Sequence, residues 1–261
     1  MRMLLLAAVI SAPLLAESDG PAKRLEESAT VFSEIISAPD KGIPDDLLEK
    51  AHCIVIVPGL KKGAFIVGGQ FGKGYLSCRR ANGRGWSAPG TVRVEGGSVG
   101  FQIGGSETDV IMLVMNQRGA DKLLSSQFML GAEGEVAAGP VGRSSTAETD
   151  AMLHAEILSW SRSRGVFAGI ALKGATLRQD VDANEALYGK KLENREIVTG
   201  GVAPPPAAAK LLALLTAIRL ASRRVSNELE FSALPGLPKF WITKSKLRGE
   251  ETCFGLSPLF F

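Results

Sequence analysis

The feature that most constrains this chain is a series of short apolar segments interrupted by glycine, which extends from Pro58 to Gly174. Thirty of the 261 residues are glycine, against an average share of about 7%. Glycine within strand-like sequence permits bulges, tight turns and close backbone contacts. With 45% hydrophobic residues available for a core, the pattern predicts an α+β fold. We expect a glycine-rich, mostly antiparallel, curved and barrel-like sheet with packed helices.

Hydrophobic periodicity places the other elements around this sheet. Apolar residues at helical spacing predict helices over 21–39, 44–52, 117–130, 182–189 and 210–225. Short β-branched or alternating runs predict strands over 53–58, within 63–115 and over 165–180. Asn82-Gly83 predicts a two-residue hairpin turn between two of these strands.

The segment from Pro58 to Arg79 combines glycine with lysine, as phosphate-binding loops do. The Gly-x4-Gly-Lys-Ser/Thr motif requires glycine where Val67 stands and serine or threonine where Gly74 stands. The motif therefore fails at both ends, and nucleotide binding is not predicted. The glycines here are better explained by turns in the sheet.

A serine motif raises the possibility of an enzyme. Gly96-Gly97-Ser98-Val99-Gly100 matches the Gly-x-Ser-x-Gly pattern of hydrolases, which requires a sharp strand-to-helix turn. Strand-like sequence on both sides of Ser98 favours a glycine hairpin instead, and a hydrolase pairing Ser98 with His154 remains an alternative. Metal-binding spacings of Cys and His are missing from the sequence. We predict no catalytic residue, metal or cofactor.

The N-terminal sequence resembles an export signal. Arg2 precedes an apolar run, and small residues end it near Ala16, which predicts a signal peptide over 1–16 and a periplasmic or secreted protein. Cys53 and Cys78 both fall in predicted strands. We interpret them as two small buried thiols, with a disulfide between them as the alternative that export would permit.

Basic residues cluster at the start of the first helix and at turns between strands. The net charge of +3 indicates a mild preference for anionic partners. Nucleic acid is not predicted, because aromatic residues make up 6% and are not interleaved with the basic ones. An anionic lipid surface is the better candidate. The candidate lipid-binding residues are Lys23, Arg24, Lys61, Lys62, Lys73, Arg79 and Arg80.

Several segments together resemble the SYLF domain, also called the Ysc84 actin-binding family, over about residues 22–200. The matching positions, in chain order, are Pro58, Gly63, Gly68, Gly69, Gly72, Gly74, Trp86-Ser87-Ala88-Pro89, Gly100-Phe101-Gln102-Ile103-Gly104, Gly139-Pro140, Ser161-Arg162-Ser163-Arg164-Gly165, Phe167-Ala168-Gly169, Asn184 and Tyr188-Gly189. This resemblance implies a domain over 17–205. Beyond it the composition changes, which predicts a basic tail over 206–261 that carries a short amphipathic helix and is otherwise poorly ordered.

The resemblance also implies a function. Eukaryotic members of this family bind phosphoinositides, and bacterial members resemble exported lipid-binding proteins of the cell envelope. We therefore expect a non-enzymatic protein, peripheral to a membrane, that binds anionic phospholipid or phosphoinositide-like headgroups. The resemblance assigns membrane contact to the N-terminal helix, with Lys23, Arg24 and the apolar face formed by Leu25, Phe32 and Ile36. Actin is a partner by family name and is not expected in the envelope. A scaffolding module that binds protein is the rival.

Overall fold

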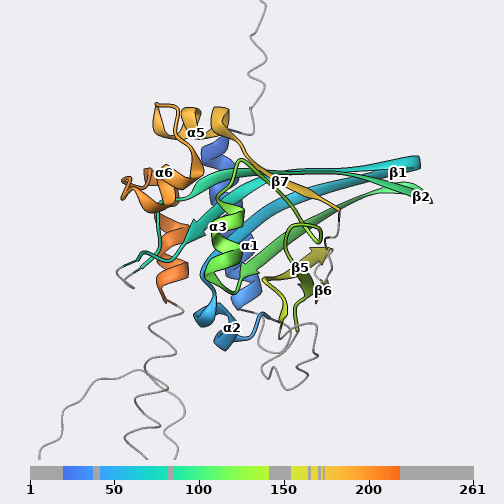
Figure 1. The fold of residues 1–261 in the computed structure, drawn as a ribbon, viewed down its shortest axis with the longest axis horizontal. Helices are drawn as coiled ribbons and strands as arrows, with labels where there is room; N and C mark the ends of the chain where they lie inside the picture. Colours follow the sequence, from blue (N-terminus) through green and yellow to red (C-terminus); the bar gives the residue numbers. More distant parts are fainter. Residues whose placement is uncertain are drawn as a thin grey trace, which may run out of the picture. The chain divides into compact units, whose positions relative to one another are not determined.

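In the part of the chain that the computed structural model describes, seven strands form one mostly antiparallel sheet with helices packed against it (Figure 1). The structure describes residues 20–37, 42–81, 85–140, 154–163, 166–169, 172 and 174–217, with the backbone alone over 64–67, 98–104 and 166–169. These residues belong to one compact unit, Met1–Arg223. The proposed signal peptide and the Asn82-Gly83 turn lie outside the described residues.

The sheet is built on two very long strands. β1 (Cys53–Cys78) pairs with β2 (Gly90–Val114), and the order of the remaining strands is β3-β7-β2-β5-β4, with β6 on β5. The shorter strands are β3 (Gln127–Met129), β4 (Val136–Ala138), β5 (Ile157–Ser163), β6 (Val166–Gly169) and β7 (Thr176–Gln179). Every pairing between them is antiparallel except that of β4 with β5. The predicted α+β class with a mostly antiparallel sheet is confirmed.

The helices are short apart from the first. They are α1 (Pro21–Ile36), α2 (Asp45–Lys50), α3 (Gln117–Leu123), α5 (Val181–Tyr188), α6 (Asn194–Thr199) and the 3-10 helix η1 (Pro206–Ala208), which continues as helix over 209–217. The last of these packs on α1, where the Lys210 ammonium lies 3.4 Å from the Thr30 hydroxyl. Leu211 and Leu215 are buried. The described start of the predicted tail is thus packed on the domain.

The predicted helix over 117–130 is wrong in its second half. The helix ends at Leu123, and residues 127–129 form β3. The Ser125 hydroxyl lies 2.6 Å from the backbone oxygens of Lys122 and Gln127, and such local bonds compete with helix formation. Phe128 and Leu130 are both buried and stand two residues apart, which is the period of a strand.

β1 reverses its direction along its own length. An extended strand of its length would separate its ends by roughly 80 Å, yet the Cα atoms of Cys53 and Cys78 are 3.9 Å apart and their sulfurs form a disulfide. The His52 carbonyl also accepts a hydrogen bond from the Arg79 amide (2.8 Å). The disulfide that the sequence left as an alternative therefore fastens together the two ends of a folded ribbon.

The reversal of β1 is matched by β2. Residues 53–64 of β1 pair with the second half of β2, residues 104–114, which is its returning half. Residues 66–76 of β1 pair with the first half of β2, residues 90–100, which is its outgoing half. The register shifts between Ala64 and Ile66, where the ladder bends. Such an irregularity accommodates a sharp change of strand direction.

Two glycines let the halves of β1 pass close to each other. A Cβ atom on Gly74 would lie 2.1 Å from the Ile56 carbonyl oxygen, and one on Gly72 would lie 2.8 Å from side-chain carbons of Val57 and Leu60. A side chain at Gly72 would displace those of Val57 and Leu60, and one at Gly74 would overlap the backbone itself. Within the segment that raised the phosphate-loop question, Gly74 is therefore required by close packing of backbone on backbone.

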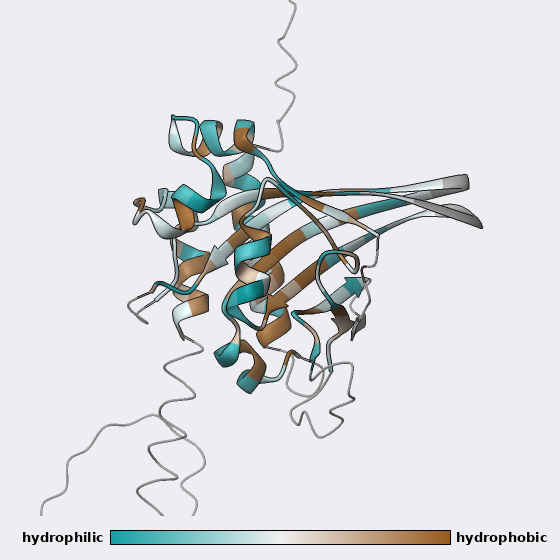
Figure 2. Ribbon diagram, in the orientation of Figure 1, coloured by the Kyte–Doolittle hydropathy of each residue, from teal (hydrophilic) through white to brown (hydrophobic). Residues whose placement is uncertain are grey.

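The bent sheet buries apolar residues on both faces. Along the start of β1, Cys53, Val55 and Val57 belong to one buried cluster, while Ile54 and Ile56 belong to the other. α1 covers the second cluster with Leu25, Ala29 and Phe32, among others. Figure 2 shows the hydrophobic colouring concentrated on the strands beneath the helices. Burial on both faces explains why the strand sequence over 53–57 is continuously apolar.

Candidate functional site

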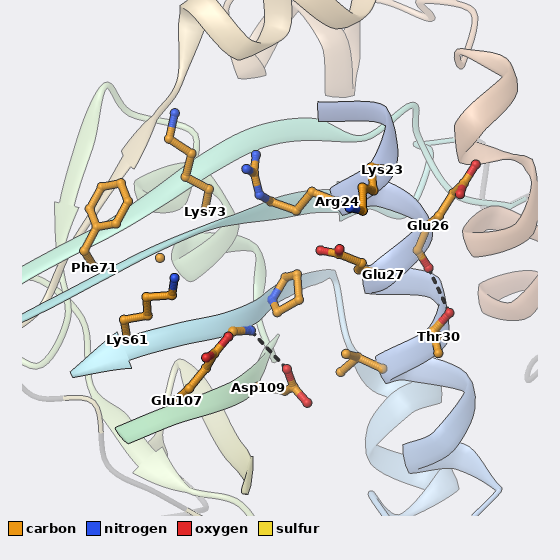
Figure 3. A pocket seen from close by; sticks show the side chains of 14 residues that line it. Lys23, Arg24, Glu26, Glu27, Thr30, Lys61, Phe71, Lys73, Glu107 and Asp109 are labelled. Carbon is orange, nitrogen blue, oxygen red and sulfur yellow. Dashed lines mark hydrogen bonds between the residues drawn. The ribbon is translucent and has the colours of Figure 1, made fainter. Parts of the chain in front are cut away.

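A groove between α1 and the β1–β2 ribbon collects four of the seven predicted lipid-binding residues (Figure 3). Lys23 and Arg24 come from α1, and Lys61 and Lys73 come from the two halves of β1. The groove has a volume of about 780 Å³. Because β1 folds back on itself, residues twelve positions apart in the sequence lie at one site.

The position of α1 is fixed by its apolar face. Pro21 occupies the first turn, where a missing N–H costs nothing, and its carbonyl oxygen accepts a hydrogen bond from the Tyr75 hydroxyl. Burial chiefly raises the pKa of Tyr75, with Arg24 opposing and Asp180 adding to the rise. The hydroxyl therefore stays a donor at neutral pH.

The packing of α1 corrects one expectation. Leu25 and Phe32, which the resemblance assigns to membrane contact, have no exposed surface, and Ile36 packs against the same buried cluster. In this structure the apolar face of α1 is buried in the protein core. Its polar face, including Lys23, is what borders the groove.

Lys73 is shared between the groove and the fold. Its ammonium lies 2.8 Å from Oδ2 of Asp180, whose side chain is 4% exposed, and among the described residues that oxygen has no hydrogen-bond donor besides this ion-pair partner. Oδ1 of Asp180 accepts from the Ala183 amide and caps α5. Lys73 therefore compensates a buried carboxylate that holds α5.

The groove also carries acidic side chains, so it is not a purely basic patch. Figure 3 shows Glu27, Glu107 and Asp109 bordering it together with the cations, and Glu26 also lines it. Its lining thus contains four cations and four carboxylates. A ligand for this site must present negative charge at the cations and avoid the acids.

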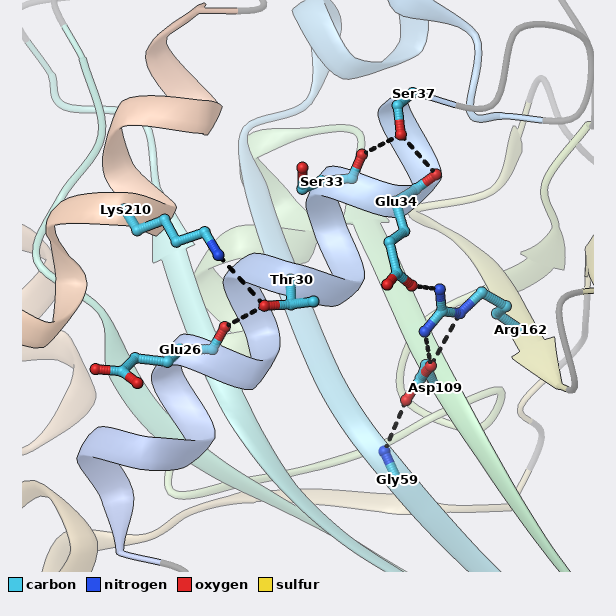
Figure 4. A network of polar contacts seen from close by, with 9 residues as sticks. All are labelled: Glu26, Thr30, Ser33, Glu34, Ser37, Gly59, Asp109, Arg162 and Lys210. Carbon is cyan, nitrogen blue, oxygen red and sulfur yellow. Dashed lines mark hydrogen bonds and ion pairs between the residues drawn. The ribbon is translucent and has the colours of Figure 1, made fainter.

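Asp109 is held by a network that connects four elements, α1, β1, β2 and β5 (Figure 4). Its Oδ2 accepts from Nε and Nη2 of Arg162 (3.0 and 2.7 Å), and its Oδ1 accepts from the Gly59 amide (3.0 Å). Arg162 also pairs with Glu34 of α1. Burial is the main cause that raises the pKa of Asp109; Glu107 adds to the rise and the Gly59 hydrogen bond opposes it. The Arg162 guanidinium compensates this acid from behind the groove.

The other three predicted site residues lie elsewhere. Lys62 is exposed on β1 but does not line the groove. Arg79 donates to the carbonyls of Leu48, Glu49 and Ala51 and lies 4.6 Å over the Trp86 ring. It therefore satisfies the C-terminal end of α2. Arg80 donates from Nε to the Trp86 carbonyl (3.0 Å). Both arginines line a different cavity, beside the disulfide.

The sequence did not reveal a buried polar network that supports the groove through α5 and α6. Asn184 Oδ1 accepts from the amide (2.8 Å) and the hydroxyl (2.6 Å) of Thr91, and its Nδ2 donates to Asn194 Oδ1 (2.9 Å) and the Leu192 carbonyl. Asn194 Nδ2 in turn donates to the Thr91 carbonyl (2.9 Å). The sequence feature that could have indicated this network is Asn184, a polar residue on the apolar side of the predicted helix over 182–189.

Substituting Asn184 tests this network. We expect Asn184→Ala to lower the free energy of unfolding by about 2–3 kcal/mol, because it leaves buried groups of Thr91 and Asn194 without partners. Urea unfolding followed by circular dichroism measures the change. Glu185→Ala, one residue away and paired only at 3.9 Å with Lys191 on the surface, should change stability by less than about 0.5 kcal/mol. If Asn184→Ala lowers the free energy of unfolding as little as Glu185→Ala does, the network does not stabilise the protein.

The enzyme alternative gains no support from the backbone. Ser98 lies inside β2 and pairs with Gly68, so strand continues on both sides where a nucleophile elbow needs a helix. Among the described residues, no three His, Cys, Asp or Glu side chains converge on a metal-binding site. Within the same part of the chain, no helix is long and apolar enough to cross a membrane.

The chain is similar to a described family and to several known proteins. Residues 95–218 match a family described as Ysc84, Las17-binding protein actin regulator. The chain is 33% identical over 192 residues to LAS seventeen-binding protein 3 of Saccharomyces cerevisiae, which covers 72% of the chain and 41% of the relative. It is 32% identical over 208 residues to SH3 domain-containing YSC84-like protein 1 of Xenopus laevis, covering 79% and 61%. The chain thus spans about two fifths to three fifths of these relatives.

Proposed function

We propose that this chain, which belongs to the Ysc84 (SYLF) family, is a non-enzymatic protein that binds anionic phospholipid headgroups. One of the two relatives is named as a binding protein, and neither is named as an enzyme. The observation that carries this proposal is the meeting of Lys23, Arg24, Lys61 and Lys73 around one groove. Three separate parts of the sequence, one in α1 and two in β1, supply these cations. Their convergence distinguishes the groove from ordinary scattered surface charge.

The electrostatics favour a membrane surface over a small neutral ligand. A lysine or arginine near an anionic surface contributes about 1 kcal/mol, and the attraction extends over a Debye length of about 10 Å at 0.1 M salt. The acids in the groove limit where a phosphate can sit, since Glu27 and Glu107 repel it. The headgroup phosphate is therefore expected beside Arg24, Lys61 and Lys73.

Vesicle co-sedimentation tests the proposal. We expect the protein to bind phosphatidylcholine vesicles that contain phosphatidylglycerol, to bind pure phosphatidylcholine weakly, and to dissociate as salt rises. The double variant Lys23→Ala/Lys61→Ala should weaken binding about thirtyfold, from about 1 kcal/mol for each cation.

A control of equal charge separates the groove from net charge. Lys190→Ala/Lys191→Ala removes the same charge from exposed residues after α5, outside the groove lining, and should leave binding within about twofold. Binding that is equal on neutral and anionic vesicles, or equally weakened by both double variants, contradicts the groove as the lipid site.

Export belongs to the same proposal. The charged start, apolar run and small-residue end over 1–16 support delivery to the periplasm or outside the cell. In that compartment anionic phospholipid is the available surface, and the finer choice of a phosphoinositide-like headgroup is left to the same vesicle series. Cell fractionation with a tagged full-length chain, compared with one lacking residues 2–16, measures the localisation.

Protein binding is the second candidate, and the names of the relatives favour it. One relative is named for binding LAS seventeen, and the matched family is described as an actin regulator. We propose a scaffolding role as the rival for this chain. Truncation after residue 217 discriminates between the two. Loss of localisation with lipid binding intact favours scaffolding through the tail, and loss of neither favours the groove.

A further inference from the structure

The bent end of the β1–β2 ribbon leaves the protein core. Lys61, Lys62 and Gly63 are exposed in succession on β1, and their pairing partners over 105–107 on β2 are exposed as well. In a strand packed on a core, alternate residues are buried. Successive exposure on both paired strands shows that neither face of this half of the ribbon is covered there, whereas on the other half Gly68 is buried. Figure 1 shows the two strands extending beyond the helices.

The sequence beyond this point is apolar. The ribbon tip, defined as residues 64–67 (Ala-Phe-Ile-Val) and 99–103 (Val-Gly-Phe-Gln-Ile), contains seven apolar residues among nine and no charge. The backbone pairs Ile66 with Gly100 and Val67 with Val99, so the two segments lie side by side at the bend. A two-stranded ribbon cannot bury apolar residues by itself. Apolar sequence carried past the edge of the core marks a contact with another apolar phase.

The reach of the tip fits a shallow insertion. Two or three residues separate Gly63 from the bend, which at about 3.3 Å per residue gives roughly 7–10 Å. Interfacial segments bury their apolar side about 5–10 Å deep, whereas spanning a bilayer core requires about 30 Å. The outer edges of a two-stranded ribbon also keep unpaired backbone groups, which makes deeper insertion costly.

The residues next to the tip match the headgroup layer. Lys61 and Lys62 are separated from the apolar segment by Gly63 alone, and lysine side chains reach back to headgroups while their neighbours enter the apolar layer. Lys61 also lines the groove, as does Phe71 on the returning half of β1, whose side chain is 48% exposed. The groove and the tip are therefore neighbouring parts of one ribbon.

We propose that the ribbon tip inserts into the outer part of one leaflet of an anionic membrane while the groove binds the headgroups. This inference rests on the proposed lipid binding and deepens it, since the apolar face of α1 is buried in the core and the tip takes over the role of apolar anchor. A second copy of the chain, pairing through the ribbon edges, is the competing occupant that the test must separate.

Tryptophan at the tip reports insertion directly. The full-length chain carries Trp241→Phe as background and Phe65→Trp as the probe. We expect the fluorescence emission of the tryptophan at residue 65 to shift to the blue on vesicles of phosphatidylcholine and phosphatidylglycerol. Bromine placed near the headgroup end of the acyl chains should quench it. Glu185→Trp, on the exposed side of α5, should show neither effect. Phe65→Ser/Phe101→Ser should weaken vesicle binding at least tenfold and leave the melting temperature unchanged, since the ribbon beside the tip is already exposed.

Three results would overturn the inference, and they are distinguishable. Salt-sensitive binding to anionic vesicles with no quenching at residue 65, and no loss in the serine double variant, rejects the tip and leaves the lipid-binding function standing. Absence of vesicle binding by the unmodified chain rejects the function on which the inference rests. A blue shift without vesicles that grows with protein concentration, accompanied by a dimer mass in light scattering, assigns the tip to a second copy.

Discussion

Gly74→Ala is expected to lower the free energy of unfolding by about 3 kcal/mol or more, the upper part of the range for overpacking. The added methyl group would lie 2.1 Å from the Ile56 carbonyl oxygen and 2.8 Å from the Val57 Cα. Both atoms belong to backbone in the centre of the sheet, so neither can move aside as a flexible side chain would. Urea unfolding monitored by circular dichroism gives the change, and poor expression of soluble protein would accompany it.

Gly63→Ala is the matched control for this substitution. Gly63 lies on the same strand and has an ordinary backbone conformation, and the methyl group of an alanine there would have no neighbouring atom within 4 Å. Its effect should therefore stay within about 0.5 kcal/mol. If both variants are as stable as the unmodified protein, the two halves of β1 do not approach each other closely at Gly74. If both are strongly destabilised, glycine is required along the strand for a reason other than close packing.

Reduction of the Cys53–Cys78 disulfide should destabilise the protein by about 3 kcal/mol. The bond closes a loop with a sequence separation of 25, and the loss of chain entropy in the unfolded state for such a loop corresponds to about 3 kcal/mol. Because both cysteines are buried, the folded protein should resist mild reductant and lose the bond when it unfolds. The urea midpoint with and without dithiothreitol measures the effect.

The thiol count provides the control for this experiment. Alkylation of the denatured, unreduced chain should modify Cys253 alone, and prior reduction should add two modified cysteines. Cys253→Ser should leave the urea midpoint unchanged in both conditions. Three modified cysteines without reduction, or a midpoint insensitive to dithiothreitol, would mean that Cys53 and Cys78 pack as the two buried thiols that the sequence alone favoured.

Local pattern was sufficient to predict several elements, but it did not predict the full length of β1 and β2 or where the elements meet. The helical spacing of Leu25, Ala29 and Phe32 predicted α1, and the continuous apolar run over 53–57 predicted a buried strand. The contact of Cys53 with Cys78 depends on where β1 reverses, and no periodicity encodes that. The same limit explains the error over 117–130, where Phe128 suits a helix face and a strand equally well.

The candidate site was only partly accessible for the same reason. The basic residues predicted an anionic partner. The sequence could not show that Arg79 donates its hydrogen bonds to carbonyls at the end of α2, whereas Lys61 lines a groove. Glu107 and Asp109 were missed because they come from a distant segment. Asp109 enters the groove from the returning half of β2, fifty residues from its hydrogen-bond donor Gly59.

The ion pair between Lys73 and Asp180 makes ligand binding and helix docking thermodynamically coupled. An anion that draws the Lys73 ammonium toward itself must compete with a buried carboxylate that also caps α5. Such coupling is reciprocal, so whatever free energy the ligand loses to this competition is lost equally from the docking of α5. The state of α5 would then report occupancy of the groove, as amide hydrogen exchange in residues 181–188 that quickens on lipid binding.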